Sequence, residues 1–138
     1  VCGGTSANIV GRVLRRKIET TLNYADPTLP PTGKIQGIDL VTEGVLTLSR
    51  TVEILRSYTE HKTDAFYFHR LDEDNGAAKI AKLILEDCTG LKIFAGRAIN
   101  PAHQNPGLPS DLSIKMQLLD QLASLVEQLG KPVEKTYY

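Results

Sequence analysis

The sequence of 138 residues has no excess of either charge, because 16 lysine and arginine residues balance 16 aspartate and glutamate residues. Proteins that bind nucleic acid normally carry a basic excess, and the longest run of basic residues here is Arg15-Arg16-Lys17. No apolar stretch approaches the roughly 20 residues that a membrane-spanning helix needs. No charged-then-apolar secretory leader opens the sequence either. We therefore expect neither a nucleic-acid partner nor a membrane partner.

Cysteine is scarce, with Cys2 and Cys88 alone in the sequence. Two cysteines are too few for a disulfide framework, so a reducing cytoplasm is the expected compartment. The three histidines, His61, His69 and His103, share no metal-ligand spacing with either cysteine. The sequence therefore favours neither a zinc site nor a Cys–His nucleophile.

Strand and helix patterns alternate along the chain, which has the length of one domain covering residues 1–138. Helices are expected at residues 7–17, 45–58, 77–87 and 111–129, and strands at 19–24, 38–41, 91–95 and 133–138. Val1 and Cys2 are expected to end a further strand whose beginning is missing, so we expect this chain to be part of a longer one. Residues 60–76 show no clear periodicity and are expected to be irregular.

This alternation is typical of α/β proteins. We expect a three-layer fold with a mainly parallel sheet of about five strands and helices on both faces, Rossmann-like or flavodoxin-like. In such sheets, ligands bind beyond the carboxyl ends of the strands, where loops lead into helix N-termini. Three loops occupy such positions, and we expect them along one edge of the sheet. Their candidate ligand-binding residues are Gly3, Gly4, Thr5, Ser6, Asn8, Asp39, Thr42, Glu43, Gly44, Arg97, Asn100, His103 and Asn105.

The first loop combines two glycines with hydroxyl groups and with the free N–H groups of a helix start. Such a loop can hold a phosphate or a carboxylate. It matches neither the dinucleotide-binding fingerprint nor the P-loop. The capping preference of hydroxyl residues favours the alternative, an ordinary strand-to-helix turn capped by Thr5 or Ser6.

Asp39 and Glu43 are spaced so that they could act as an acid–base or metal-binding pair. The alternative is that both side chains are solvated and that Glu43 favours the start of its helix. The loop holding Arg97, Asn100, His103 and Asn105 is either a lid that faces a ligand or a connector stiffened by proline.

Two segments at these loops, residues 1–10 (VCGGTSANIV) and 37–48 (GIDLVTEGVLTL), resemble the C-terminal region of the stage II sporulation protein E family of bacterial Ser/Thr protein phosphatases. Residues 96–106 (GRAINPAHQNP) and 111–115 (DLSIK) extend the resemblance. The resemblance implies that this chain is an accessory domain that follows a catalytic domain. In the family, the catalytic domain holds two Mn²⁺ or Mg²⁺ ions through aspartates, several of which stand next to glycine. The present sequence contains no Asp-Gly dipeptide. We therefore assign no catalytic residue, metal or cofactor to this chain.

The leading hypothesis is a non-catalytic regulatory domain that binds a small anionic ligand and docks on the catalytic phosphatase domain of the same chain. One alternative is a small α/β enzyme that acts on a phosphorylated or carboxylated metabolite, with Asp39 or Glu43 as base. That alternative requires both carboxylates to converge on the Gly3-Gly4 turn. A second alternative is a dimerisation module, which would form a homodimer through an apolar patch.

Overall fold

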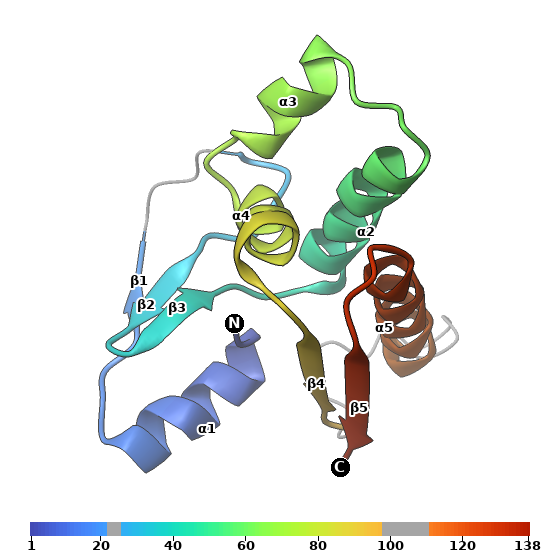
Figure 1. The fold of residues 1–138 in the computed structure, drawn as a ribbon. Helices are drawn as coiled ribbons and strands as arrows, with labels where there is room; N and C mark the ends of the chain where they lie inside the picture. The colour runs from blue at the N-terminus through green and yellow to red at the C-terminus, as the bar shows by residue number, and fades with distance from the viewer. Residues whose placement is uncertain (22–25, 98–110) are drawn as a thin grey trace.

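The computed structural model describes residues 1–21, 26–97 and 111–138 (Figure 1). Its elements follow one another as α1 (Gly4–Leu14), β1 (Glu19–Thr20), β2 (Gly33–Ile35), β3 (Ile38–Val41), α2 (Val45–Thr59), α3 (Ala65–Leu71), α4 (Gly76–Lys82), the π-helical turn η1 (Leu83–Asp87), β4 (Leu91–Ala95), α5 (Asp111–Gln128) and β5 (Val133–Tyr137).

The expected five-stranded, mainly parallel sheet is wrong. The described strands form two sheets, an antiparallel sheet in the order β1-β2-β3 and a parallel pair, β4 and β5. The reason lies in the turn between β2 and β3, which consists of Gln36 and Gly37 alone, with Gly37 at φ +87°. A two-residue turn of this kind joins only antiparallel neighbours. β2 was not predicted from the sequence, because its three residues are too few to show a period and directly follow a proline-rich segment.

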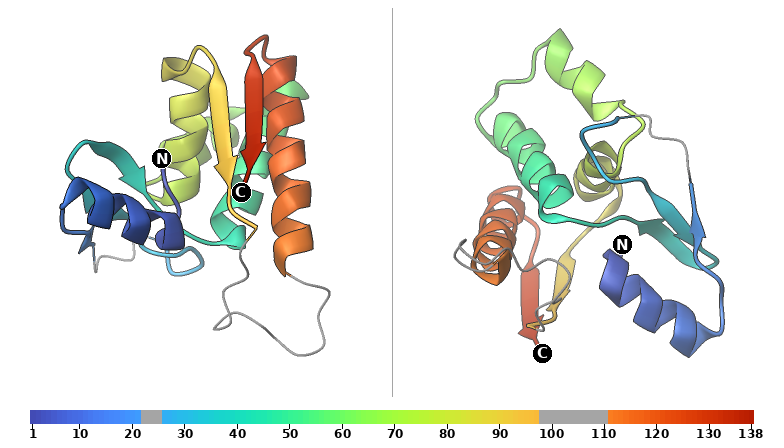
Figure 2. Two further views of the ribbon diagram at one scale, coloured as in Figure 1. Left: turned by 90° about the horizontal axis from the view of Figure 1, so that it is seen from below. Right: turned by 180° about the vertical axis from the view of Figure 1, so that it is seen from behind.

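The extended N-terminal residues pair with β3 in the parallel direction. The Cys2 N–H donates to the Leu40 carbonyl at 3.0 Å, and the Thr42 N–H donates to the Cys2 carbonyl at 3.1 Å. The chain then turns into α1, which packs on β2 and β3 through a small apolar cluster around Ala7, Ile35 and Val41. Figure 2 shows α1 lying against this antiparallel sheet, away from α5.

The main core lies on the other face of β3. Since side chains alternate along a strand, Val41 faces α1 while Thr42 faces α4, where its Oγ1 lies against Gly76. Around this face α2, α4 and α5 pack together with the inner face of β4 and β5. Leu55 of α2, Ala77 of α4 and Val126 of α5 are completely buried in this core.

Residues 60–76, expected to be irregular, contain helix α3. Asp64 caps it by accepting a hydrogen bond from the Tyr67 N–H at 2.9 Å. Tyr67 and Leu71, one helical turn apart, are buried, whereas Phe66 and Phe68 are exposed. Seven residues are too few to show a helical period in the sequence, and this explains the wrong prediction.

Replacing Leu55 by alanine will test the main core. The Leu55 side chain is 0% exposed, so the substitution leaves a cavity and we expect the free energy of unfolding to fall by about 2–5 kcal/mol. Leu46→Ala on the same helix is the matched control, because Leu46 is 63% exposed. We expect Leu46→Ala to change stability by less than about 0.5 kcal/mol in urea unfolding. Equal losses in the two variants would contradict this description of the core.

Candidate functional site

The Gly3-Gly4 turn opens α1, but its hydroxyl groups do not cap the helix. Gly3 is the N-cap, in extended conformation, and no side chain of the described residues accepts a hydrogen bond from the first turn. Thr5, Ser6 and Asn8 are exposed on the helix. The expected cap by Thr5 or Ser6 is therefore wrong, because the helix begins one residue before Thr5.

The first two predicted loops lie side by side, as expected. A Cβ atom added to Gly3 would lie 3.8 Å from the Thr42 carbonyl oxygen, and one added to Gly4 would collide with Oε2 of Glu43. The carboxylate of Glu43 thus covers the N-terminal end of α1. An anionic ligand at this helix end would meet a negative charge already there.

Gly44 is the N-cap of α2 and adopts φ +95°, a conformation that favours glycine. A Cβ at this position would also lie 3.3 Å from Cγ of Pro30. The Thr47 hydroxyl donates back to the Glu43 carbonyl at 2.8 Å. Gly44 therefore has a structural role in starting α2.

Thr42 is buried, and its hydroxyl has no hydrogen-bond partner among the described residues. It points towards Gly76 of α4, where an added Cβ would lie 2.5 Å from Oγ1. The Thr42 side chain therefore faces the protein interior and away from the turn that Glu43 covers.

Asp39 lies at the opposite end of α1 from Glu43. Asp39 lines a cavity with Arg15 and Arg16, which follow the last turn of α1, whereas Glu43 covers Gly4 in the first turn. The helix between them has 11 residues and is about 16 Å long at 1.5 Å per residue. The two carboxylates and the Gly3-Gly4 turn consequently do not converge.

The third predicted loop is described only at its beginning. The Arg97 guanidinium lies 5.4 Å from the centre of the Tyr137 ring, and the Arg97 N–H donates to the Tyr138 carbonyl at 2.8 Å. Arg97 therefore extends the pairing of β4 with β5. Asn100, His103 and Asn105 lie outside the described residues.

The cavity that Asp39 lines has more basic than acidic residues in its lining, and we call it the basic cavity. Its volume is about 550 Å³. It lies between the C-terminal end of α1 and the β2–β3 hairpin. Its lining residues are Arg15, Arg16, Lys17, Glu19, Lys34, Ile35, Gln36, Ile38 and Asp39.

Four cationic side chains and two carboxylates surround the basic cavity. Arg16 is fixed there because its Nη1 donates to the Gln36 carbonyl. Gly37 makes this contact possible, since a Cβ on Gly37 would collide with the same nitrogen. From the sequence, Arg15, Arg16 and Lys17 stood out only as the longest run of basic residues. The sequence feature that could have indicated this cavity is Lys34, which lies in a short strand just before a Gln-Gly turn.

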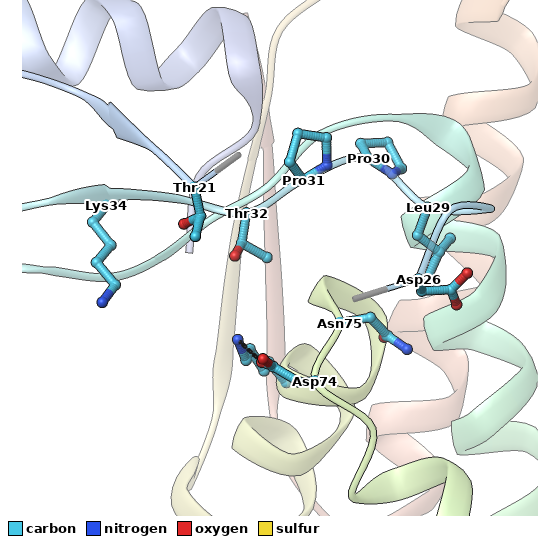
Figure 3. A pocket seen from close by; sticks show the side chains of 10 residues that line it. Thr21, Asp26, Leu29, Pro30, Pro31, Thr32, Lys34, Asp74 and Asn75 are labelled. Atoms are coloured by element: carbon cyan, nitrogen blue, oxygen red, sulfur yellow. Dashed lines mark ion pairs between the residues drawn. The ribbon is translucent and has the colours of Figure 1, made fainter. Parts of the chain in front are cut away.

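A second cavity of about 310 Å³ lies between the proline-rich segment and the start of α4 (Figure 3). Three of its charged groups have partners within the protein, and Lys34 lines this cavity as well as the basic cavity. Lys79 pairs with Asp74 at 2.5 Å, and Asp26 accepts hydrogen bonds from the Thr28 hydroxyl and backbone N–H, which lower the pKa of the Asp26 carboxyl. This cavity is therefore a weaker candidate than the basic cavity.

Neither metal nor thiol chemistry is indicated in the part of the chain that the structure describes. It contains no group of three or more His, Cys, Asp or Glu side chains that could hold a metal ion. Partial burial raises the pKa of the Cys2 thiol, so this group stays protonated at neutral pH. Among the described helices, none is long and apolar enough to cross a membrane.

No family model, curated protein or solved structure matches this chain.

Replacing Thr42 by valine will test whether its hydroxyl has a partner. Valine removes a buried hydroxyl without changing the shape, so we expect stability to stay constant or to rise by up to about 1 kcal/mol. Thr51→Val is the matched control. The buried Thr51 hydroxyl donates to the Thr47 carbonyl at 2.8 Å, and its loss should cost about 1 kcal/mol. A similar loss in both variants, measured by urea unfolding, would mean that Thr42 has a partner.

Proposed function

We propose that this chain is a non-catalytic, cytoplasmic regulatory domain that binds a small anionic metabolite in the basic cavity. The observation that carries the proposal is that Arg15, Arg16, Lys17 and Lys34 all line one cavity, Lys34 lining the second cavity as well. These residues come from two separate segments of the chain. They share the cavity because the β2–β3 hairpin brings Lys34 beside the end of α1.

The electrostatics of this cavity favour an anion. Neighbouring cations repel one another, and a ligand that neutralises them relieves that repulsion. A guanidinium can bind a phosphate or a carboxylate through two parallel hydrogen bonds. The main-chain dipole at the C-terminal end of α1 favours the cations in the absence of ligand.

The two carboxylates in the lining restrict the ligand further. Glu19 and Asp39 repel a second anionic group but accept hydrogen bonds from hydroxyl groups. We therefore propose a phosphorylated metabolite that also carries hydroxyl groups. The volume of about 550 Å³ lies within the usual range for small-molecule sites.

The resemblance to the stage II sporulation protein E family supports a place for this domain beside a catalytic Ser/Thr phosphatase domain of the same chain. Regulation requires the ligand to bind one docked arrangement more tightly than another. The rival enzyme hypothesis loses its support, because Asp39 and Glu43 lie at opposite ends of α1.

Titration calorimetry with AMP and glucose 6-phosphate, with glucose as the uncharged control, will test the proposal. We expect saturable binding of at least one phosphorylated probe and none of glucose. Arg15→Gln/Lys34→Gln removes two cavity charges and leaves the Arg16 contact with Gln36 in place. This double variant should weaken binding by about tenfold or more.

Arg50→Gln/Lys62→Gln is the matched control. It removes the same charge from two exposed residues that pair with Glu53 and Glu60 outside the basic cavity. The affinity of this control variant for the phosphorylated probe should stay within about twofold of the original protein's, because Arg50 and Lys62 do not line the basic cavity. Loss of their exposed ion pairs should also change stability little. Absence of heat with both phosphorylated probes, or equal weakening in the two double variants, would refute the proposed site.

A further inference from the structure

Arg15, the residue that ends α1, has a left-handed main-chain conformation, with φ +54° and ψ +43°. Residues with a Cβ atom seldom adopt this conformation, because the Cβ comes too close to the following carbonyl oxygen. Glycine is the usual residue at such a helix end. Among the described residues, His61 is the other non-glycine residue with a positive φ. Histidine is one of the residue types enriched in this conformation, so the arginine is the more unusual of the two.

The packing of the chain around Gly11 fixes the conformation of Arg15. The Arg16 N–H donates to the Gly11 carbonyl at 2.8 Å, and a Cβ atom added to Gly11 would lie 3.0 Å from the Arg16 carbonyl oxygen. Ile18 then packs against the small apolar cluster that holds α1. The chain therefore reverses direction at Arg15, and a glycine there would make the same turn with less strain. The turn alone does not explain an arginine at this position.

Arg15 also lacks a partner for its charge among the described residues. It lines the basic cavity together with the carboxylates of Glu19 and Asp39. Neither carboxylate forms an ion pair with Arg15, and the Arg15 side chain makes no hydrogen bond to a described residue. The donors of this guanidinium are therefore available to a ligand in the cavity.

The other three cations of the basic cavity are less suited to bind a phosphate group through two hydrogen bonds. Arg16 already donates from Nη1 to the Gln36 carbonyl. Lys34 lines the second cavity as well. Lys17 carries an ammonium group, which lacks the planar fork of donors that a guanidinium has. Arg15 is thus the cation of this lining with a complete fork of donors and no described partner.

We propose that Arg15 binds the phosphate group of the ligand through two parallel hydrogen bonds, and that this role accounts for an arginine where the turn favours glycine. The inference rests on the proposed function of the basic cavity and names the residue that recognises the phosphate there. The guanidinium fork matches two oxygens of a phosphate group. Strained main-chain conformations of this kind are found at ligand clamps, where the surrounding structure fixes them.

Two substitutions of Arg15 separate its strain from its contact with the ligand. Arg15→Gly removes both, so the urea unfolding midpoint should rise, with an unfolding equilibrium constant about threefold lower. The same variant should bind the phosphorylated probe, AMP or glucose 6-phosphate, about tenfold more weakly in titration calorimetry. Arg15→Lys keeps the charge and the Cβ atom. Its midpoint should stay constant, whereas its affinity should also fall about tenfold, because an ammonium group cannot replace the fork.

His61→Gly and Lys17→Gln are the matched controls. His61→Gly relieves a positive φ outside the basic cavity, so the affinity should stay within about twofold of the original protein's. Lys17→Gln removes one cavity charge without touching the proposed contact, and it should weaken binding by about threefold or less.

The possible failures of this inference and of the proposed function can be told apart. If a phosphorylated probe binds the original protein and both Arg15 variants within about twofold, Arg15 does not bind the phosphate, and the inference is overturned while the proposed function stands. A midpoint that does not rise in Arg15→Gly overturns the explanation by strain. If neither AMP nor glucose 6-phosphate binds the original protein, the proposed function itself is refuted.

Discussion

The pairing of Cys2 with Leu40 and Thr42 determines how the N-terminal half of the protein is arranged. It places the start of α1 beside the end of β3, so Gly4 lies under the Glu43 carboxylate. The helix then runs back along β3, and its last turn reaches the β2–β3 hairpin. One short stretch of main-chain pairing thus separates the two carboxylates of the enzyme hypothesis and brings the basic residues to Lys34.

Elements whose pattern is local were predicted well from the sequence. The strands expected at 38–41 and 91–95 have those bounds, and the helix expected at 45–58 is α2, Val45–Thr59. Apolar periodicity and flanking turn residues suffice for such elements. Which strands pair is not a local property. The antiparallel sheet depends on the strand Gly33–Ile35, whose three residues are too few to show a period.

The candidate site shows the same difference between local patterns, which the sequence predicts, and tertiary contacts, which it does not. The sequence correctly placed the Gly3-Gly4 turn beside Thr42 and Glu43, because both follow strands that run in parallel. It did not anticipate that Glu43 would cover this turn, since the position of a side chain over another residue depends on tertiary packing. The basic cavity was missed for a related reason. Arg15 and Lys34 become neighbours only through the unrecognised hairpin.

The two apolar clusters differ in size, and this difference bears on the proposed regulatory function. Among the described residues, Ala7, Ile35 and Val41 are the buried members of the cluster that holds α1, whereas the main core includes fully buried residues from α2, α4 and α5. Regions with few buried apolar contacts open at a lower free energy than the global unfolding transition. A ligand that contacts Arg15 and Lys34 would tie the C-terminal end of α1 to the hairpin. Under the proposed function its binding energy would act on α1, and the main core would stay unchanged.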